Sequence, residues 1–313
     1  MAGVQPQPAT IRPGIPADVF APEVEAVQPR GLARGFQSLQ RSPVGAIGAS
    51  LIAIVLFVAI FGDFIAPHEA AKANFRARYQ PPAWQEGGDW IYPLGTDQLG
   101  RDILSRIIIG SRVSVIVGLM TVLVAGSFGV LVGLVSGFLG GWVDLFLMRI
   151  VDASLAIPYI VLVVAVSGVV GQGLITLIVI LSLLNWQAYS RVVRGEVLSA
   201  RELEYVVAAR VIGQTRFKIM LRHILPNVTA SVIVLATLQV AITILAESSL
   251  SFLGLGVQPP DVTWGLVAAD GRAVIGSAWW ISTMPGIAIS LAVLGIIFLG
   301  DWLRDVLDPR LDT

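Results

Sequence analysis

The stretch Glu204-Tyr-Val-Val-Ala-Ala-Arg-Val-Ile-Gly213, which runs on to Ile224-Leu-Pro226, decides how the chain is interpreted. It is a charged, helix-forming stretch set between two long hydrophobic segments. Gly213 can take the left-handed backbone conformation that ends a helix. Pro226 suits the first turn of the next helix, where its missing N–H costs little. The stretch therefore predicts a short helix, a sharp turn and a second short helix between two membrane spans.

The composition places most of the chain in lipid. Hydrophobic residues make up 55% of the 313 residues and charged residues 13%, about half the charge of a typical soluble domain. Six apolar segments each reach the roughly 20 residues that a helix needs to cross a bilayer. Lipid cannot satisfy open backbone groups, so these segments must be helices. They lie at 44–66, 112–137, 150–170, 172–190, 228–250 and 280–302.

Two features modify these spans. Gly129, Gly133 and Gly137 have the spacing that lets membrane helices approach closely, although glycine is also common in membrane helices generally. Pro158 is expected to kink the third span.

The Lys and Arg residues predict the orientation. The loop 191–227 carries seven of them, which favours the cytoplasmic side. The N-terminal residues 1–43 and the C-terminal residues 304–313 then also lie in the cytoplasm, as an even number of spans requires. We expect 1–43 to be largely disordered, with a short amphipathic piece possible at 32–39. The segment 67–111 also carries several cations yet must lie outside, which conflicts with the rule.

Two outer segments are expected to be structured. In 67–111, apolar residues from Gln98 to Arg112 recur at helical spacing, which predicts an amphipathic helix lying at the membrane interface. In 254–280, Trp264, Trp279 and Trp280 are expected to anchor the headgroup region. Stacking against a substrate is the alternative role for these tryptophans.

The chain offers little chemistry for catalysis. It has no cysteine and two histidines, and it contains neither a phosphate-binding loop nor a hydrolase triad. We therefore expect no catalytic, cofactor-binding or metal-binding residues. The ionisable residues in or near the spans lie close to the predicted span ends, where each is expected to reach water; they are Arg149, Asp152, Glu247 and Asp301.

From the residues alone, the loop 191–227 has two interpretations. A short helix with small and charged residues suits docking into a groove on a partner. A basic amphipathic loop can equally rest on anionic lipid.

Four motifs, in order, resemble the ABC importer permeases of the DppC/OppC family over about residues 40–313. The first is Pro93-Leu-Gly-Thr-Asp-Gln-Leu-Gly-Arg-Asp-Ile-Leu-Ser-Arg106, and the second joins Ala208-Ala209 and Gly213 to Ile224-Leu-Pro226. The third is Ala246-Glu-Ser-Ser-Leu-Ser-Phe-Leu-Gly-Leu-Gly-Val-Gln-Pro-Pro260 with Trp264-Gly265. The last is Gly300-Asp-Trp-Leu-Arg-Asp-Val-Leu-Asp-Pro-Arg-Leu311.

The resemblance implies an all-α, six-span permease of the type I importer fold in the bacterial plasma membrane. The implied regions are the tail 1–43, a first span 44–66, an outer loop 67–111, a five-helix core 112–303 and the end 304–313. The implied partners are a homologous second permease, two ATP-binding subunits, an extracytoplasmic peptide-binding protein and lipid, without nucleic acid. ATP and Mg would be bound by the partners, and this chain would hold no cofactor.

The family also implies that the loop helix docks into the ATPase subunit and transmits its closure. The residues expected to couple to the ATPase are Glu204, Tyr205, Ala208, Ala209 and Gly213. Val207 stands where the family loop usually begins with Glu, which puts in doubt any ion pair from that position.

The expected function is the import of di- or oligopeptides driven by ATP. Import of nickel or another small solute is the alternative within the family. An integral membrane enzyme would need converging polar residues in the spans, and a passive channel subunit would not need a glycine-broken cytoplasmic helix.

Overall fold

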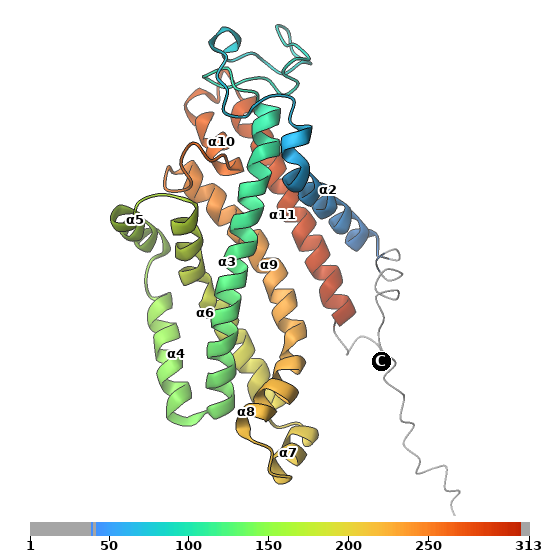
Figure 1. Cartoon of the computed structure of the whole chain (residues 1–313), viewed down its shortest axis with the longest axis vertical. Coiled ribbons are helices and arrows are strands. Elements are labelled where there is room, and N and C mark those ends of the chain that lie inside the picture. Colours follow the sequence, from blue (N-terminus) through green and yellow to red (C-terminus); the bar gives the residue numbers. More distant parts are fainter. Residues whose placement is uncertain (1–38, 40–41, 308–313) are drawn as a thin grey trace, which may run out of the picture.

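The computed structural model describes residue 39 and residues 42–307, and this part of the chain is built from helices (Figure 1). The expectations for 1–43 and 32–39 concern residues that the structure does not describe, except for residues 39, 42 and 43. Residues 308–313 are also outside the described part of the chain. The longer helices are α2 (Pro43–Ile65), α3 (Ile103–Leu139), α4 (Gly141–Leu155), α5 (Tyr159–Val170), α6 (Leu174–Ala200), α9 (Leu225–Phe252) and α11 (Trp280–Leu307). The shorter elements are η2 (Phe75–Ala77), α7 (Glu204–Val211), α8 (Arg216–Ile219), η3 (Met220–Ile224), α10 (Trp264–Asp270) and η4 (Arg272–Val274).

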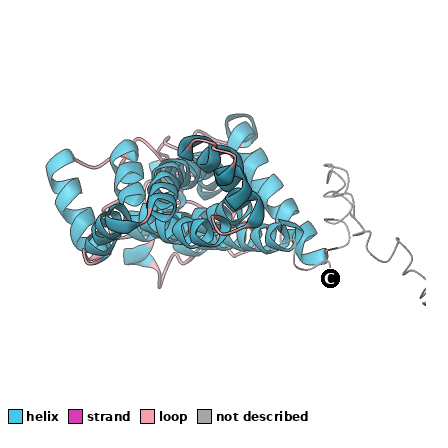
Figure 2. Ribbon diagram, turned by 90° about the horizontal axis from the view of Figure 1, so that it is seen from below, coloured by secondary structure: helices cyan, strands magenta, loops and turns pink. Residues whose placement is uncertain are grey.

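Five helices are long and apolar enough to cross a membrane, and there are six spans if one bent pair is counted as a single span. The bent pair is α4 and α5, whose axes differ by 84°. The sequence predicted a kink at Pro158 within the span 150–170. The chain does bend there, but more than a kink requires: α4 ends at Leu155 and α5 begins after Pro158. Figure 2 looks along the bundle and shows an elongated rather than a round cross-section.

The most extensive packing in the bundle joins α3 to α6, and glycines on α3 make it possible. A side chain at Gly133 would place its Cβ 2.7 Å from the carbonyl oxygen of Ser190, and one at Gly129 would meet the carbonyl oxygen of Trp186. The Ser190 hydroxyl donates to the Gly129 carbonyl oxygen at 3.1 Å. The small-residue spacing therefore marks a real helix contact, in which the two backbones approach closely.

The end of the molecule at the top of Figure 1 holds residues 66–102 and 253–279. We call it the outer end, because the sequence predicts these segments to lie outside the cytoplasm. Asp102 caps α3, since its carboxylate accepts hydrogen bonds from the backbone N–H groups of Leu104 and Ser105. The helix then runs without a break to Leu139. The separate interfacial helix expected at 98–112 is therefore absent from the described structure, because residues 103–112 form the first turns of a 37-residue helix and residues 98–102 precede it.

Two tryptophans expected at the headgroups are instead buried in the outer end. Trp264 is 2% exposed and Trp280 is 5% exposed. The indole N–H of Trp264 donates to the Ile107 carbonyl oxygen at 2.9 Å, and that of Trp280 donates to the Thr96 carbonyl oxygen at 3.1 Å. The Trp264 ring thus joins α10 to α3, and the Trp280 ring joins α11 to the segment before α3, rather than anchoring the protein in lipid headgroups.

A cluster of four charges also joins the outer segments. Arg106, which is 1% exposed, lies 2.7 Å from carboxylate oxygens of both Asp97 and Asp270. Arg101 contacts the same two carboxylates at 2.6 and 2.9 Å. Buried charges need such pairing because an unpaired buried charge is costly. The residues before α3 and the residues of α10 are thereby held as one unit.

The glycine contact between α3 and α6 can be tested with a matched pair of substitutions. Gly129→Ala should destabilise the protein by about 1–3 kcal/mol, because the new methyl group must push two backbones apart. Gly168→Ala, also within a helix but with open space around its Cβ position, should be neutral or slightly stabilising. Thermal aggregation of the detergent-purified variants measures the difference, and equal melting of the two would contradict the close contact.

Candidate docking site in the loop between α6 and α9

We call residues 201–224 the connecting loop. It leaves the end of α6, forms α7 and returns through α8 to α9. Gly213, with a φ of 79°, ends α7 in the left-handed conformation that the sequence predicted. The N–H of Gln214 donates to the carbonyl oxygen of Ala209 and that of Gly213 to Arg210, both at 3.1 Å. This pair of hydrogen bonds is the Schellman motif, which satisfies the last carbonyls of a helix.

The second short helix is not a separate element. Residues 216–252 form one continuous helix that passes through a π-helical turn at Met220–Ile224. Pro226 lies in the first turn of α9, where its missing N–H is tolerated. The connecting loop therefore contains one separate helix, α7, followed by an extension of the helix that continues as α9.

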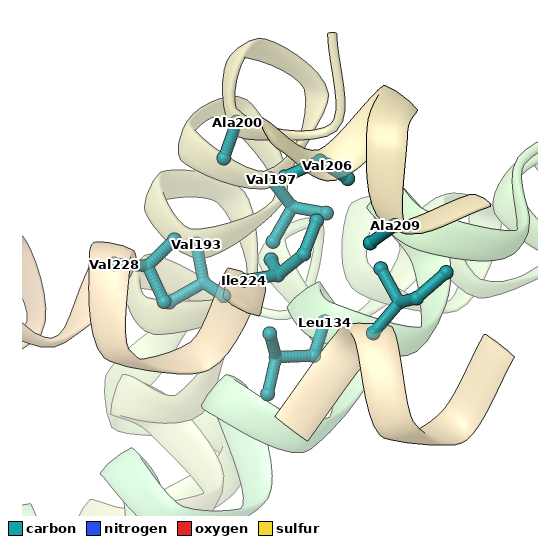
Figure 3. Close-up of a cluster of buried hydrophobic side chains, with 9 residues drawn as sticks. Leu134, Val193, Val197, Ala200, Val206, Ala209, Ile224 and Val228 are labelled. Atoms are coloured by element: carbon teal, nitrogen blue, oxygen red, sulfur yellow. The ribbon is translucent and has the colours of Figure 1, made fainter. Parts of the chain in front are cut away.

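A buried hydrophobic cluster fixes α7 to the spanning helices (Figure 3). Val206 and Ala209 supply the side chains from α7, and they are 0% and 5% exposed. The other members come from α3, α6, α8, η3 and α9; they are Leu134, Val193, Val197, Ala200, Ile219, Ile224 and Val228. Since protein interiors are close-packed and transmit strain, a displacement of α7 must move the ends of the spanning helices.

Ala208 and Ala209 were both predicted to couple to the ATPase, but only Ala209 belongs to the cluster. Ala208 is exposed, whereas Ala209 points into the cluster. The side chain of Ala209 is therefore not on the exposed face of α7, which we expected it to share with Ala208. Neighbouring helix positions differ by about 100° around the axis, and the side of α7 that carries Ala209 is the one covered by the cluster.

The exposed face of α7 is apolar. Val207 is 40% exposed, Val211 81% and Ile212 74%. Together with Ala208 these side chains line a shallow groove whose remaining wall is formed by Glu202 and Glu204. Residues at spacings of three, four and seven share one helix face, so this face could have been read from the sequence. We had singled out Glu204 and Ala208 on this face but missed Val211 and Ile212.

Two polar contacts also hold the connecting loop in place. The phenol oxygen of Tyr205 accepts a hydrogen bond of 2.7 Å from the amide of Asn227, at the start of α9. His223 Nε2 lies 3.0 Å from Gln214 Oε1. Tyr205, which the sequence placed among the coupling residues, thus also ties α7 to α9.

Ion pairs hold the neighbouring helix ends. Arg194 of α6 contacts both carboxylate oxygens of Asp144, at 2.5 and 2.7 Å, and Asp144 also accepts a hydrogen bond from Ser136. Arg191 lies 2.7 Å from Asp152 of α4. These pairs use cations that the sequence had counted only toward membrane orientation.

Glu247 was expected to reach water, and the structure contradicts that expectation. Its side chain is fully buried near the outer end of α9. Asp152, by contrast, is exposed, as is Asp301. The linear position of Glu247, near a span end, did not reveal that α10 folds over it.

In the described residues, no three His, Asp or Glu side chains come close enough together to hold a metal ion. The absence of a metal or cofactor in this chain stays a prediction from the sequence.

The fold defines a class: a helical protein with five or six candidate membrane spans and a connecting loop fixed rigidly to three of them. The model of the family "Binding-protein-dependent transport system inner membrane component" matches residues 129–313. A second model, the "N-terminal TM domain of oligopeptide transport permease C", matches residues 32–82. The chain belongs to this family of multi-pass permeases of ABC importers.

Characterised relatives are similar along most of the chain. The di/tripeptide transport system permease protein DppC of Pseudomonas aeruginosa is 39% identical over 93% of this chain and 96% of its own length. The dipeptide transport system permease protein DppC of Escherichia coli K12 is 44% identical over 87% of this chain and 91% of its own. The protein of the same name from Bacillus subtilis is 37% identical, covering 88% and 85%.

Among solved structures, a chain of the MetNI methionine ABC transporter gives a TM-score of 0.47 at 21% identity. It covers 61% of this chain and 93% of its own length. This similarity is too low to carry an argument.

The left-handed end of α7 gives a prediction with an internal control. Gly213→Val should strain the backbone by about 1–3 kcal/mol, because a β-branched residue avoids positive φ. Gly213→Asn should be tolerated, because asparagine accepts this conformation. No other group lies near the site of the added Cβ, so the effect comes from the backbone alone.

Limited trypsin digestion in detergent measures this strain, since Arg210, Arg216 and Lys218 are exposed on either side of the turn. The valine variant should be cut in the connecting loop roughly fivefold faster or more. The asparagine variant should match the unsubstituted protein. Equal cutting of all three proteins would show that the Gly213 conformation does not hold the loop.

Proposed function

We propose that this chain is the membrane subunit of an ATP-driven importer of dipeptides, and that α7 docks into a separate ATPase subunit. The observation that supports the docking best is the exposed apolar face of α7 on a loop that is packed rigidly against α3, α6 and α9. The relatives named as di- and tripeptide or dipeptide permeases support the substrate.

The position of α7 favours a soluble protein partner over lipid. Figure 1 places α7 beyond the ends of α3 and α4, at the tip of the molecule. Val211 and Ile212 would otherwise expose apolar surface to water, which marks an interaction site. The groove wall carries two carboxylates, Glu202 and Glu204, and anionic lipid would repel these charges.

Val207 makes the proposed docking surface more apolar. The family places a carboxylate at this position, whereas the Val207 side chain contributes apolar surface to the groove. Docking here then depends mainly on apolar burial, with Glu202 and Glu204 at the rim. Such an interface is less sensitive to salt than one that is built on a central ion pair.

The remaining parts of the proposal follow from the family. A second, homologous permease completes the translocation pathway, two ATPase subunits bind ATP and Mg, and an extracytoplasmic binding protein delivers the peptide. The connecting loop and both termini lie in the cytoplasm. ATPase closure would shift the helix bundle between two arrangements, a coupling of distant sites through a bistable element. This chain carries out no bond chemistry.

Docking can be tested with charge substitutions on matched exposed residues. Val211→Asp should weaken co-purification of the ATPase subunits at least about tenfold, because it places an unpaired charge in an apolar interface. Phe217→Asp is the control, since Phe217 is also exposed, at 68%, but does not line the groove. Equal retention of the ATPase subunits by both variants would overturn the docking face.

One set of experiments tests both the proposed absence of ATP hydrolysis by this chain and the proposed substrate. The purified chain alone should hydrolyse no ATP, while the complete complex in proteoliposomes should import the radiolabelled dipeptide Ala-Ala only when ATP is inside with the ATPase subunits. Hydrolysis by the isolated chain would contradict the proposed role. Uptake of nickel in place of Ala-Ala would contradict the proposed substrate but would leave the proposed mechanism unchanged.

A further inference from the structure

Glu247 is a carboxyl group buried among hydroxyls. It lies on α9 with 0% exposure, and its oxygens accept hydrogen bonds from three serines. Ser251 donates at 2.8 Å, Ser114 of α3 at 3.3 Å and Ser248 at 3.4 Å. No Lys, Arg or His among the described residues pairs with it. An ionisable group inside a membrane span without a cation is expensive, and it indicates a function.

One of these serines extends the network to α10. The Ser114 hydroxyl donates to Glu247 and accepts a hydrogen bond of 3.3 Å from the backbone N–H of Trp264, the first residue of α10. The Trp264 indole N–H donates to the Ile107 carbonyl oxygen, about two turns further out on α3. The start of α10 is therefore held to α3 at two points, and Glu247 orients one of them.

Close backbone contacts leave little space around the start of α10. A side chain at Gly265 would place its Cβ 2.6 Å from the Cα of Ser248, and one at Gly110 would reach within 3.3 Å of the Thr263 carbonyl carbon. Thus α10 lies in a notch between α3 and α9 with no room to shift. A segment packed in this way has discrete rather than continuous positions.

We propose that Glu247 is a positioning residue that sets α10 in the notch between α3 and α9, so that the outer end of the bundle closes together with the movement of α3. The inference rests on the proposed transport function. The four-charge cluster of Asp97, Arg101, Arg106 and Asp270 ties the residues before α3 to the end of α10. Glu247 ties the start of α10 to α3 and α9. With both ends fixed, the outer segments move with the spanning helices.

The consequence is a specific defect in coupling. Without the network, α10 can leave its notch without a matching movement of α3. The ATPase cycle then proceeds while the outer end fails to close, and ATP is hydrolysed without uptake. A residue needed only for folding would instead reduce uptake and ATP hydrolysis together.

The test uses the complete complex in proteoliposomes with radiolabelled Ala-Ala and measures ATP hydrolysed per dipeptide imported. Ser114→Ala and Glu247→Leu should raise this ratio about fivefold or more, the lower end of typical coupling between two sites. Glu247→Gln keeps an acceptor oxygen and should stay near the unsubstituted ratio. Ser249→Ala, on the exposed side of α9, is the matched control.

A second readout does not depend on transport. The chain has no cysteine, so nitroxide labels can be placed at Ala273→Cys, just after α10, and Leu119→Cys on the exposed face of α3, with cysteine-free partners. Double electron–electron resonance should give one narrow distance distribution in the unsubstituted and Glu247→Gln proteins. Ser114→Ala and Glu247→Leu should add a second, displaced population.

The outcomes separate the two proposals. An unchanged ratio and an unchanged distance distribution in Glu247→Leu would overturn the positioning role, as would a Glu247→Gln defect equal to that of Glu247→Leu. If the unsubstituted complex imports no Ala-Ala, the proposed substrate fails. The distance distributions then still decide whether Glu247 positions α10.

Discussion

The close approach of α3 to α6 is the constraint on which the rest of the structure depends. It requires glycine at successive turns of α3, because any side chain at Gly129 or Gly133 would collide with the backbone of α6. In a bilayer the hydrophobic effect does not drive helices together, so packing of this kind and buried hydrogen bonds must do so. The Ser190 hydroxyl adds such a bond to the Gly129 carbonyl.

The contact between α3 and α6 also relates the two ends of the molecule, which are the outer segments and the connecting loop. Asp102 at the outer start of α3 contacts His68, and Arg106 and Ser114 of α3 contact Asp270 and Trp264 of the outer segments. The inner end of α6 leads into α7, and Leu134 of α3 packs in the cluster beneath it. One helix, 37 residues long at about 1.5 Å per residue, thus contacts both the connecting loop and the outer network. A rigid element of this length can relate events on the two sides of a membrane.

The sequence predicted the features that depend on local physics. The end of α7 at Gly213 follows from the backbone freedom of glycine, and the helical class follows from the need to satisfy backbone groups in lipid. The glycine spacing on α3 predicted a close contact but not its partner. Pro158 was recognised, yet its effect was underestimated: a proline removes one hydrogen bond and also clashes with the preceding turn, and here the helix ends altogether.

The errors have a common cause in contacts between distant parts of the chain. Arg106 meets Asp270 across 164 positions, and Ser114 meets Glu247 across 133. Neither pairing leaves a local pattern. Trp264 and Trp280 fit the composition of an interfacial belt, but the loops fold back and bury both rings. The position of a residue along a span gave no indication of what covers it.

By itself, the sequence determined that the chain is helical, spans a membrane, places a short glycine-ended helix between two spans and resembles a family of permeases. Only the tertiary structure decided that Ala208 faces outward while Ala209 is buried, that Val211 and Ile212 complete an exposed face, and that Glu247 lies beneath α10. The physical reason is that helical periodicity shows which residues share a face. Which face meets a neighbour, in helices that are apolar on all sides, is decided by packing among residues far apart in the chain.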